Sequence, residues 1–192
     1  EQYVVCSDYL FAFDHVTTGR QWVYEAKTGA IVNSTITIGD GTVFFIESQN
    51  VKTLDTENGR NKPVTLLAGG ASLVAIDLQT GNEKWRVDSA TTKVQHNLYV
   101  AYSSSNVITV GSRNSGTDKT TARVVYDIEA VDGATGKRIW QQEQMQQTKI
   151  GGDHGEQDLH PVIVGNTLYC EPMAYDVATG KPQEWGWKLG KR

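Results

Sequence analysis

The sequence lacks the features that indicate several common classes of protein. No apolar run approaches the ~20 residues that a membrane-spanning helix needs, so we predict no transmembrane segment. The 192 residues carry 18 Lys and Arg against 22 Asp and Glu, which gives a formal net charge of −4. This balance excludes the basic patch of a nucleic-acid-binding protein. No stretch has the periodicity of an amphipathic helix, which excludes a predominantly helical fold.

Several enzyme classes are also excluded by what is missing. The only two cysteines are Cys6 and Cys170, so the chain has neither an adjacent cysteine pair nor a Cys-x-x-Cys-His haem attachment. There is no phosphate-binding glycine loop and no nucleophile elbow, and no serine or threonine stands in a recognisable triad arrangement. We therefore predict no catalytic residue by motif.

What the sequence does contain is a short pattern that recurs four times. Two copies share the spacing Ala-x-Asp-x-x-Thr-Gly-x-x-x-Trp, the last has one extra residue before its tryptophan, and the first has its Thr-Gly pair one place later. A recurring unit of this kind decides the fold, because each copy is one supersecondary element. The four copies are Ala12, Asp14, Gly19 and Trp22; Ala75, Asp77, Gly81 and Trp85; Ala130, Asp132, Gly136 and Trp140; and Ala174, Asp176, Gly180 and Trp185.

Each copy has the chemistry of a β-hairpin. The residues before each aspartate are apolar or alternating, which predicts a strand. The aspartate accepts hydrogen bonds from the backbone that follows it, and the glycine supplies the positive φ that closes the turn. The tryptophan on the returning strand has a large apolar face and one N–H donor, so we expect it to pack on the neighbouring repeat. The small alanine lets that flat ring lie over the backbone.

The pattern resembles the tryptophan-docking repeat of quinoprotein-type β-propellers, also called PQQ-like repeats. The stretch 154–161, followed by Ala174-Tyr175-Asp176, is also similar to uncharacterised PQQ-like repeat proteins of environmental bacteria. The resemblance covers nearly the whole chain. It implies an all-β fold, namely a β-propeller of four-stranded antiparallel blades.

We expect one partial propeller domain, residues 1–192, with about three and three-quarter blades. The first blade lacks its inner strand, and residues 3–7 are expected to be its second strand. A ring needs roughly four to eight blades, and the resemblance implies one of seven or eight. We therefore expect an arc whose remaining blades are missing from this chain; a small ring closed by the incomplete first blade is the alternative. The expected blades are residues 1–26, 31–89, 94–144 and 158–190.

Three long polar segments are predicted on one face of this arc. In a propeller, the connection from the second to the third strand and the connection between blades lie on the same face, opposite the short Asp-x-x-Thr-Gly turns. Loops that a rigid scaffold holds often carry function, so we predict that this is the working face. The segments are 48–70, 113–121 and 145–159.

The densest group of potential ligands lies in and just after the third segment. Carboxylates and imidazoles bind divalent metals and act as acids and bases, and neighbouring glycines would let the backbone approach a ligand closely. The spacing matches no zinc or calcium signature, and the alternative is a solvated loop whose polar side chains cap turns. The candidates are Asp153, His154, Glu156, Asp158 and His160, with His96 at a similar place in the preceding blade.

Three functions are compatible with this sequence. The first is a non-catalytic binding or scaffold module that presents the three segments to a protein or saccharide partner, as resemblance to non-catalytic PQQ-like proteins implies. The second is a fragment of a quinoprotein-like oxidoreductase that binds PQQ and calcium, although no motif in the chain supports this cofactor. The third is a metal-assisted enzyme that uses residues 153–160. The resemblance also implies an extracytoplasmic location, periplasmic or at the cell surface.

Overall fold

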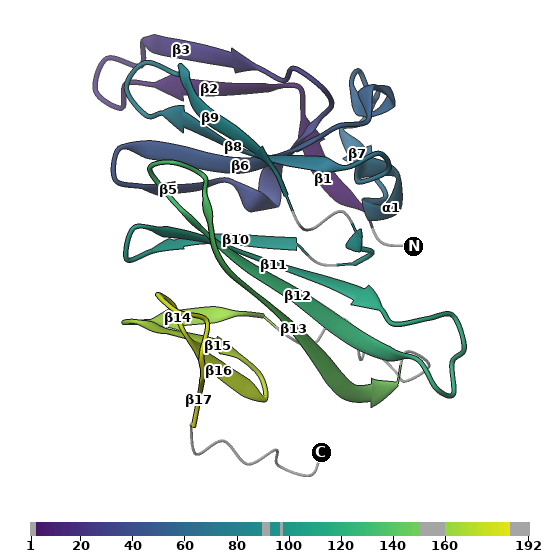
Figure 1. Ribbon diagram of the computed structural model, residues 1–192. Helices are drawn as coiled ribbons and strands as arrows, with labels where there is room; N and C mark the ends of the chain where they lie inside the picture. The colour runs from purple at the N-terminus through teal and green to yellow at the C-terminus, as the bar shows by residue number, and fades with distance from the viewer. Residues whose placement is uncertain (1–2, 90–92, 97, 150–159, 185–192) are drawn as a thin grey trace.

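A computed structural model of the chain describes residues 3–89, 93–96, 98–149 and 160–184 (Figure 1). Its strands form antiparallel sheets that lie one against the next in chain order, as the blades of a propeller do. The prediction of an all-β fold, a partial β-propeller, is therefore confirmed.

Three sheets make up the arc, and a two-stranded hairpin precedes them. Across the sheets of the third and fourth blades the strands stand in chain order, whereas the sheet of the second blade also contains strands Val4–Ser7 and Arg60–Asn61 at one edge, out of chain order. The hairpin consists of β2 (Tyr9–Phe13) and β3 (Arg20–Glu25); the second blade of β4 (Ile31–Val32), β5 (Thr37–Gly39), β6 (Thr42–Ser48), β8 (Ala71–Asp77) and β9 (Glu83–Asp88); the third of β10 (Leu98–Ser103), β11 (Asn106–Asn114), β12 (Arg123–Asp132) and β13 (Arg138–Lys149); and the fourth of β14 (Val162–Val164), β15 (Thr167–Cys170), β16 (Met173–Asp176) and β17 (Pro182–Gln183).

The strands differ in burial according to their place in the stack. Every residue of β6 is buried, as are the first six residues of β8, because the second blade has sheets on both of its faces. In β2 half-buried and exposed residues alternate, since only one face of the hairpin packs on the second blade. Strands whose two faces both pack against neighbouring sheets are therefore nearly continuous apolar runs. In the strand that packs on one face only, half-buried and exposed residues alternate.

Apolar side chains fill the space between successive sheets in three clusters. Burying each large side chain stabilises the fold by about 1.5–3 kcal/mol, so these clusters hold the blades together. Hairpin and second blade share Tyr24, Phe45, Val74 and Ile76; second and third blades share Phe44, Leu73, Val107 and Val131; third and fourth blades share Ile108, Ile128, Leu168 and Tyr175.

The first strand corrects one expectation. Residues 3–7 were predicted to form the second strand of the first blade, but β1 (Val4–Ser7) does not pair with β2. It instead lies between β4 and β7 (Arg60–Asn61), with Cys6 opposite Val32 and Val4 opposite Asn61. The long segment that follows β6 folds back to supply β7, and this gives β1 a partner that sequence spacing does not reveal.

The described parts of the long segments contain more regular structure than predicted. Segment 48–70 contains two short helices as well as β7. Strand β13 continues to Lys149, so the first residues of segment 145–159 belong to the third blade, and β11 extends to Asn114. Among the described residues, no helix is long and apolar enough to cross a membrane. The helices are a 3₁₀ turn η1 (Asn33–Thr35) between β4 and β5, a 3₁₀ turn η2 (Val51–Thr53) and α1 (Pro63–Leu66).

Candidate functional site

The two rims of the arc carry different structures. Figure 1 shows the β2–β3 and β10–β11 turns at the left, while α1 and the connection from β11 to β12 lie at the right. The right-hand rim, called here the long-loop face, thus carries the described parts of segments 48–70 and 113–121. The left-hand rim carries the repeat turns.

On the left-hand rim, each repeat aspartate caps its own turn. Asp77 Oδ1 accepts hydrogen bonds from the Thr80 N–H at 2.9 Å and from the Thr80 hydroxyl at 3.0 Å. Asp132 and Thr135 repeat this pair of bonds at 2.8 and 2.7 Å. These bonds lower the pKa of both carboxyl groups, because they favour the ionised form. The aspartates are therefore occupied within their turns.

Three tryptophans join each sheet to the following one. Each indole Nε1 donates to the carbonyl oxygen of the residue after the next repeat's aspartate, and each ring lies on the glycine of that turn. A Cβ at Gly136, for example, would lie 2.8 Å from Cε3 of Trp85. Each tryptophan also stands opposite the alanine of its own repeat in the neighbouring strand. The donated bonds are Trp22 to Leu78 at 2.9 Å, Trp85 to Gly133 at 3.0 Å and Trp140 to Val177 at 2.8 Å.

In the first repeat, the residue that closes the turn differs from the one predicted from the sequence. Gly19 was assigned to the turn-closing position, but the residue with positive φ is Thr18, at 57°. Thr17 takes the place of the repeat threonine, since its N–H donates to Asp14 Oδ1 at 2.7 Å. Gly19 matches Asn82 of the second repeat, because the Asp14 N–H bonds to its carbonyl oxygen. The first repeat therefore has the same spacing as the second. Thr18 stands in the first repeat where Gly81 stands in the second.

The fourth repeat also departs from the pattern. Ala174 pairs with Gln183, where the other repeats place their tryptophan, and Trp185 lies outside the described residues.

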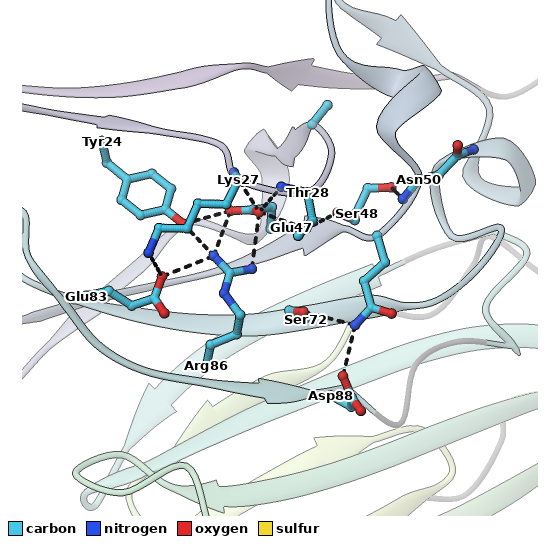
Figure 2. Close-up of polar contacts among 12 residues, drawn as sticks. Tyr24, Lys27, Thr28, Glu47, Ser48, Asn50, Ser72, Glu83, Arg86 and Asp88 are labelled. Carbon is cyan, nitrogen blue, oxygen red and sulfur yellow. Dashed lines mark hydrogen bonds and ion pairs between the residues drawn. The ribbon is translucent and has the colours of Figure 1, made fainter.

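Beneath the long-loop face, a buried carboxylate ties the hairpin to the second blade (Figure 2). The side chain of Glu47 in β6 is 0% exposed, and its Oε1 lies 3.1 Å from Nη1 of Arg86 in β9. The Tyr24 hydroxyl, on β3, donates to Oε2 at 2.7 Å. The backbone N–H groups of Lys27 and Thr28 both donate to Oε1 at 2.9 Å. One carboxylate therefore fixes the connection between the hairpin and the second blade.

The charge of Glu47 is kept despite its burial. Burial alone would raise the pKa of Glu47, but hydrogen bonds from Arg86, Tyr24 and Thr28 and the positive charge of Arg86 outweigh it and hold that pKa below its ordinary value. Arg86 also contacts Glu83 at 3.1 Å, and Lys27 reaches the same carboxylate at 2.8 Å. The arrangement is a satisfied ionic network and leaves no free group for chemistry.

The last residue of β6 and the two residues after it anchor segment 48–70 to the second blade. The Ser48 hydroxyl donates to the Leu66 carbonyl oxygen at the end of α1. Asn50 Nδ2 donates to the Thr65 carbonyl oxygen at 2.9 Å, and the Gln49 N–H donates to Gly70 O at 3.1 Å. Three successive residues thus hold α1 and the turn after it in place over the sheet.

A groove of about 490 Å³ lies between this anchored segment and the third blade. One wall comes from α1 and the turn that follows it, and it is apolar. The opposite wall comes from the residues that precede β10 and from the end of β11, and it is mostly polar. The walls are Val64, Leu67, Ala68 and Gly69 on one side and Lys93, Val94, Gln95, Arg113 and Asn114 on the other.

The polar wall is held by its own contacts. Arg113 Nε lies 2.7 Å from Asp127 Oδ2, and its Nη2 lies 2.6 Å from Glu143 Oε2. The Asn114 N–H donates to Gln95 Oε1 at 3.0 Å. In the second blade, Gln49 stands at the position that Arg113 has in the third blade. Its Nε2 donates to Ser72 on β8 and to Asp88 on β9. The end of each second strand is therefore cross-linked to the two strands outside it.

Of the predicted ligand residues, the structure describes His96 and His160, and these two have different neighbours. His96 Nε2 lies 3.2 Å from Asn114 Oδ1, beside the groove. His160 instead contacts Tyr99 on the inner strand of the third blade, with ring centroids 4.6 Å apart. Asp153, His154, Glu156 and Asp158 lie outside the described residues.

The described residues do not supply a cluster of metal ligands. Within residues 3–89, 93–96, 98–149 and 160–184, no three His, Cys, Asp or Glu side chains lie close enough together to hold a metal ion. Calcium requires six to eight oxygen ligands, usually with several carboxylates. This part of the chain therefore does not supply the donor set for such a site.

The sequence signals for the groove were weak. Lys93, Val64 and Leu67 carry no motif, and they meet only because segment 48–70 folds back onto the second blade. The one readable signal was Glu47, a charge that follows the continuous apolar run 43–46. A charge in such a strand is rarely buried unless it is paired, so a partner could have been expected.

Comparison with known proteins extends these observations. Residues 60–189 match the model of a family described as "Outer membrane protein assembly factor BamB". A search of curated proteins finds no match. Among solved structures, a europium-containing methanol dehydrogenase is 19% identical, with a TM-score of 0.41 over 73% of this chain and 22% of its own. BamB from Moraxella catarrhalis is 14% identical, with a TM-score of 0.31 over 94% of this chain and 62% of its own.

This chain thus spans less than two thirds of either solved structure, and the whole activity of either protein cannot be carried over to it. The family match covers more than half of the chain and agrees with the repeat read from the sequence and with the stacked four-stranded sheets. The chain therefore belongs to the family of PQQ-like β-propeller repeat proteins that this match defines.

Proposed function

We propose that this chain is a non-catalytic binding module whose long-loop face takes an extended segment of a protein partner. The groove beside α1 carries the proposal, because it has one apolar wall and one polar wall and both are fixed to the sheets. Val64 is 56% exposed on the apolar wall, and Lys93 is exposed on the other. A segment with one apolar side chain and one acidic side chain complements this pair.

A saccharide is the less favoured occupant. Sugars commonly pack an apolar face against an aromatic ring, and none of the described residues that line the groove is aromatic. The described part of segment 113–121 lies on the same face, and we infer that residues 145–159 extend the binding surface.

We further infer that the chain is an arc of a larger ring and that it acts outside the cytoplasm. The family description, which names an outer membrane protein assembly factor, supports an extracytoplasmic location. A propeller ring needs roughly four to eight blades, and the described residues form three sheets and a hairpin, which supports further blades in the complete ring.

Selection from a displayed random-peptide library against the immobilised protein tests the groove. We expect enriched peptides to pair an apolar with an acidic residue, and to lose binding to the Val64→Arg and Lys93→Glu variants. The matched control is Val16→Arg, because Val16 is 76% exposed on the opposite rim. Peptides that bind all three variants equally would refute the groove as the site.

A further inference from the structure

A second cavity lies between the inner strands of the third and fourth blades. Its volume is about 300 Å³, at the lower end of the range for small-molecule sites. It shares no lining residue with the groove on the long-loop face. Its apolar walls come from both blades, namely from Ile108 and Val110 on β11 and from Ile163 and Leu168 on β14 and β15.

Two ring side chains bring polar groups to this apolar cavity. Tyr99 and His160 both line it, with ring centroids 4.6 Å apart and planes inclined at 58°. Among the described residues, the Tyr99 hydroxyl has no hydrogen-bond partner. Burial raises the pKa of Tyr99, so this hydroxyl keeps its proton and can both donate and accept.

The second polar group is an acceptor. His160 Nδ1 lies 3.2 Å from the Pro161 carbonyl oxygen. Because a carbonyl oxygen only accepts, Nδ1 carries the ring proton in this contact, and in that tautomer Nε2 accepts a hydrogen bond. An apolar cavity with a few placed polar groups has the composition of a ligand site.

We propose that this cavity binds a small single-ring aromatic molecule that carries a hydroxyl group, that is, a ligand of the phenol class. The ring would contact the apolar walls and the two ring side chains, since aromatic pairs attract at centroid separations of about 4.5–7 Å. The ligand hydroxyl would donate to His160 Nε2 and accept from the Tyr99 hydroxyl. The site is distinct from the groove and does not depend on the function proposed for it.

Ligand-observed NMR with 4-methylphenol tests the proposal on the whole chain, with toluene as the probe that lacks the hydroxyl. We expect 4-methylphenol to bind at least several times more tightly than toluene. Tyr99→Phe should weaken 4-methylphenol by about three- to tenfold, the effect of one lost hydrogen bond, and leave toluene unchanged. The control is Tyr169→Phe, because Tyr169 lies in β15 and does not line the cavity.

Two variants that fill the cavity locate the binding. Ala101→Leu and Ile163→Phe add volume at opposite walls, and either should weaken both probes at least tenfold while the tryptophan fluorescence stays that of the wild type. The site is refuted if both folded variants bind as the wild type does, or if neither probe binds at about 10 mM. Equal binding of toluene and 4-methylphenol would refute the phenol class.

Discussion

Arg86 on β9 and Glu47 on β6 form a two-pronged ion pair, with 3.1 Å between Nη1 and Oε1 and 3.2 Å between Nη2 and Oε2. Tyr24 and Thr28 bond the same carboxylate from the hairpin side (Figure 2). The pair therefore lies at the junction between the hairpin and the second blade, and it supports segment 48–70, which begins at the next residue.

We expect Glu47→Gln to destabilise the fold by about 1.5–3 kcal/mol, because it weakens the charge-assisted hydrogen bonds to the buried carboxylate while Arg86 keeps Glu83 as a partner. Guanidinium denaturation followed by tryptophan fluorescence measures the loss. The control is Glu25→Gln, since Glu25 is exposed on β3 and an exposed substitution should change stability by no more than about 0.5 kcal/mol. Equal losses for the two variants would show that the network contributes nothing particular.

Stability should also fall in acid. Glu47 and Asp77 have folded-state pKa values below the ordinary 4.5 and 3.8. As the pH drops, these carboxyl groups bind protons in the unfolded chain at their ordinary pKa values, and in the folded chain only at a lower pH. The stabilisation is therefore fully present at a pH above the ordinary pKa values, and it is lost as the pH falls through the lowered pKa values of the folded chain.

Urea denaturation between pH 7 and pH 3 measures this dependence. The free energy of unfolding should be level above about pH 6 and decrease below about pH 4.5. Glu47→Gln should flatten part of that decrease, because it removes one of the linked groups. A protein that becomes more stable on acidification would contradict the assigned hydrogen bonds.

The sequence predicted the fold well because its signals are local and repeated. Asp77, Thr80 and Gly81 define a turn by themselves, and the spacing to Trp85 places the ring on the returning strand. The same spacing in the next repeat supplies the surface on which that ring lies. Three such repeats are sufficient to define the sheets and their order.

The groove and the details of the first repeat depend on contacts that spacing does not encode. Strand β1 finds its partners at Val32 and Asn61, which are distant in sequence. Thr18 has the positive φ that is usual for glycine. Because Gly19 is the neighbouring glycine, the sequence pattern assigns the turn-closing position to the wrong residue. The groove exists only because Ser48 and Asn50 bind α1, and neither residue belongs to a motif.

Adding one methyl group beneath a docked tryptophan should be costly. Gly136 has a φ of 72°, and a Cβ there would lie 2.8 Å from the Trp85 ring. Gly41 has a similar φ of 66°, but a Cβ there would meet nothing within 4 Å. Both alanine variants suffer the backbone strain of about 1 kcal/mol, and only Gly136→Ala also meets the indole.

We therefore expect Gly136→Ala to cost about 1–3 kcal/mol more than Gly41→Ala, the usual cost of overpacking. Thermal unfolding of the two variants side by side gives the difference. If the two losses were the same, the indole would not press on the turn.

Thr18→Gly should make the protein more stable, although it deletes a side chain. A threonine at a φ of 57° carries about 1–2 kcal/mol of backbone strain, which glycine does not. Part of this gain is offset, because glycine gives the unfolded chain more conformational freedom, so we expect a net gain of about 0.5–1 kcal/mol. Thr17→Gly is the matched comparison and should destabilise instead, since it removes the hydroxyl that caps Asp14 at 3.0 Å. Chemical denaturation measures the change in the free energy of unfolding for both variants. A gain for Thr18→Gly and a loss for Thr17→Gly would establish that Thr18 occupies the glycine position of the first repeat. A loss of stability in both variants would indicate that Gly19 occupies it instead.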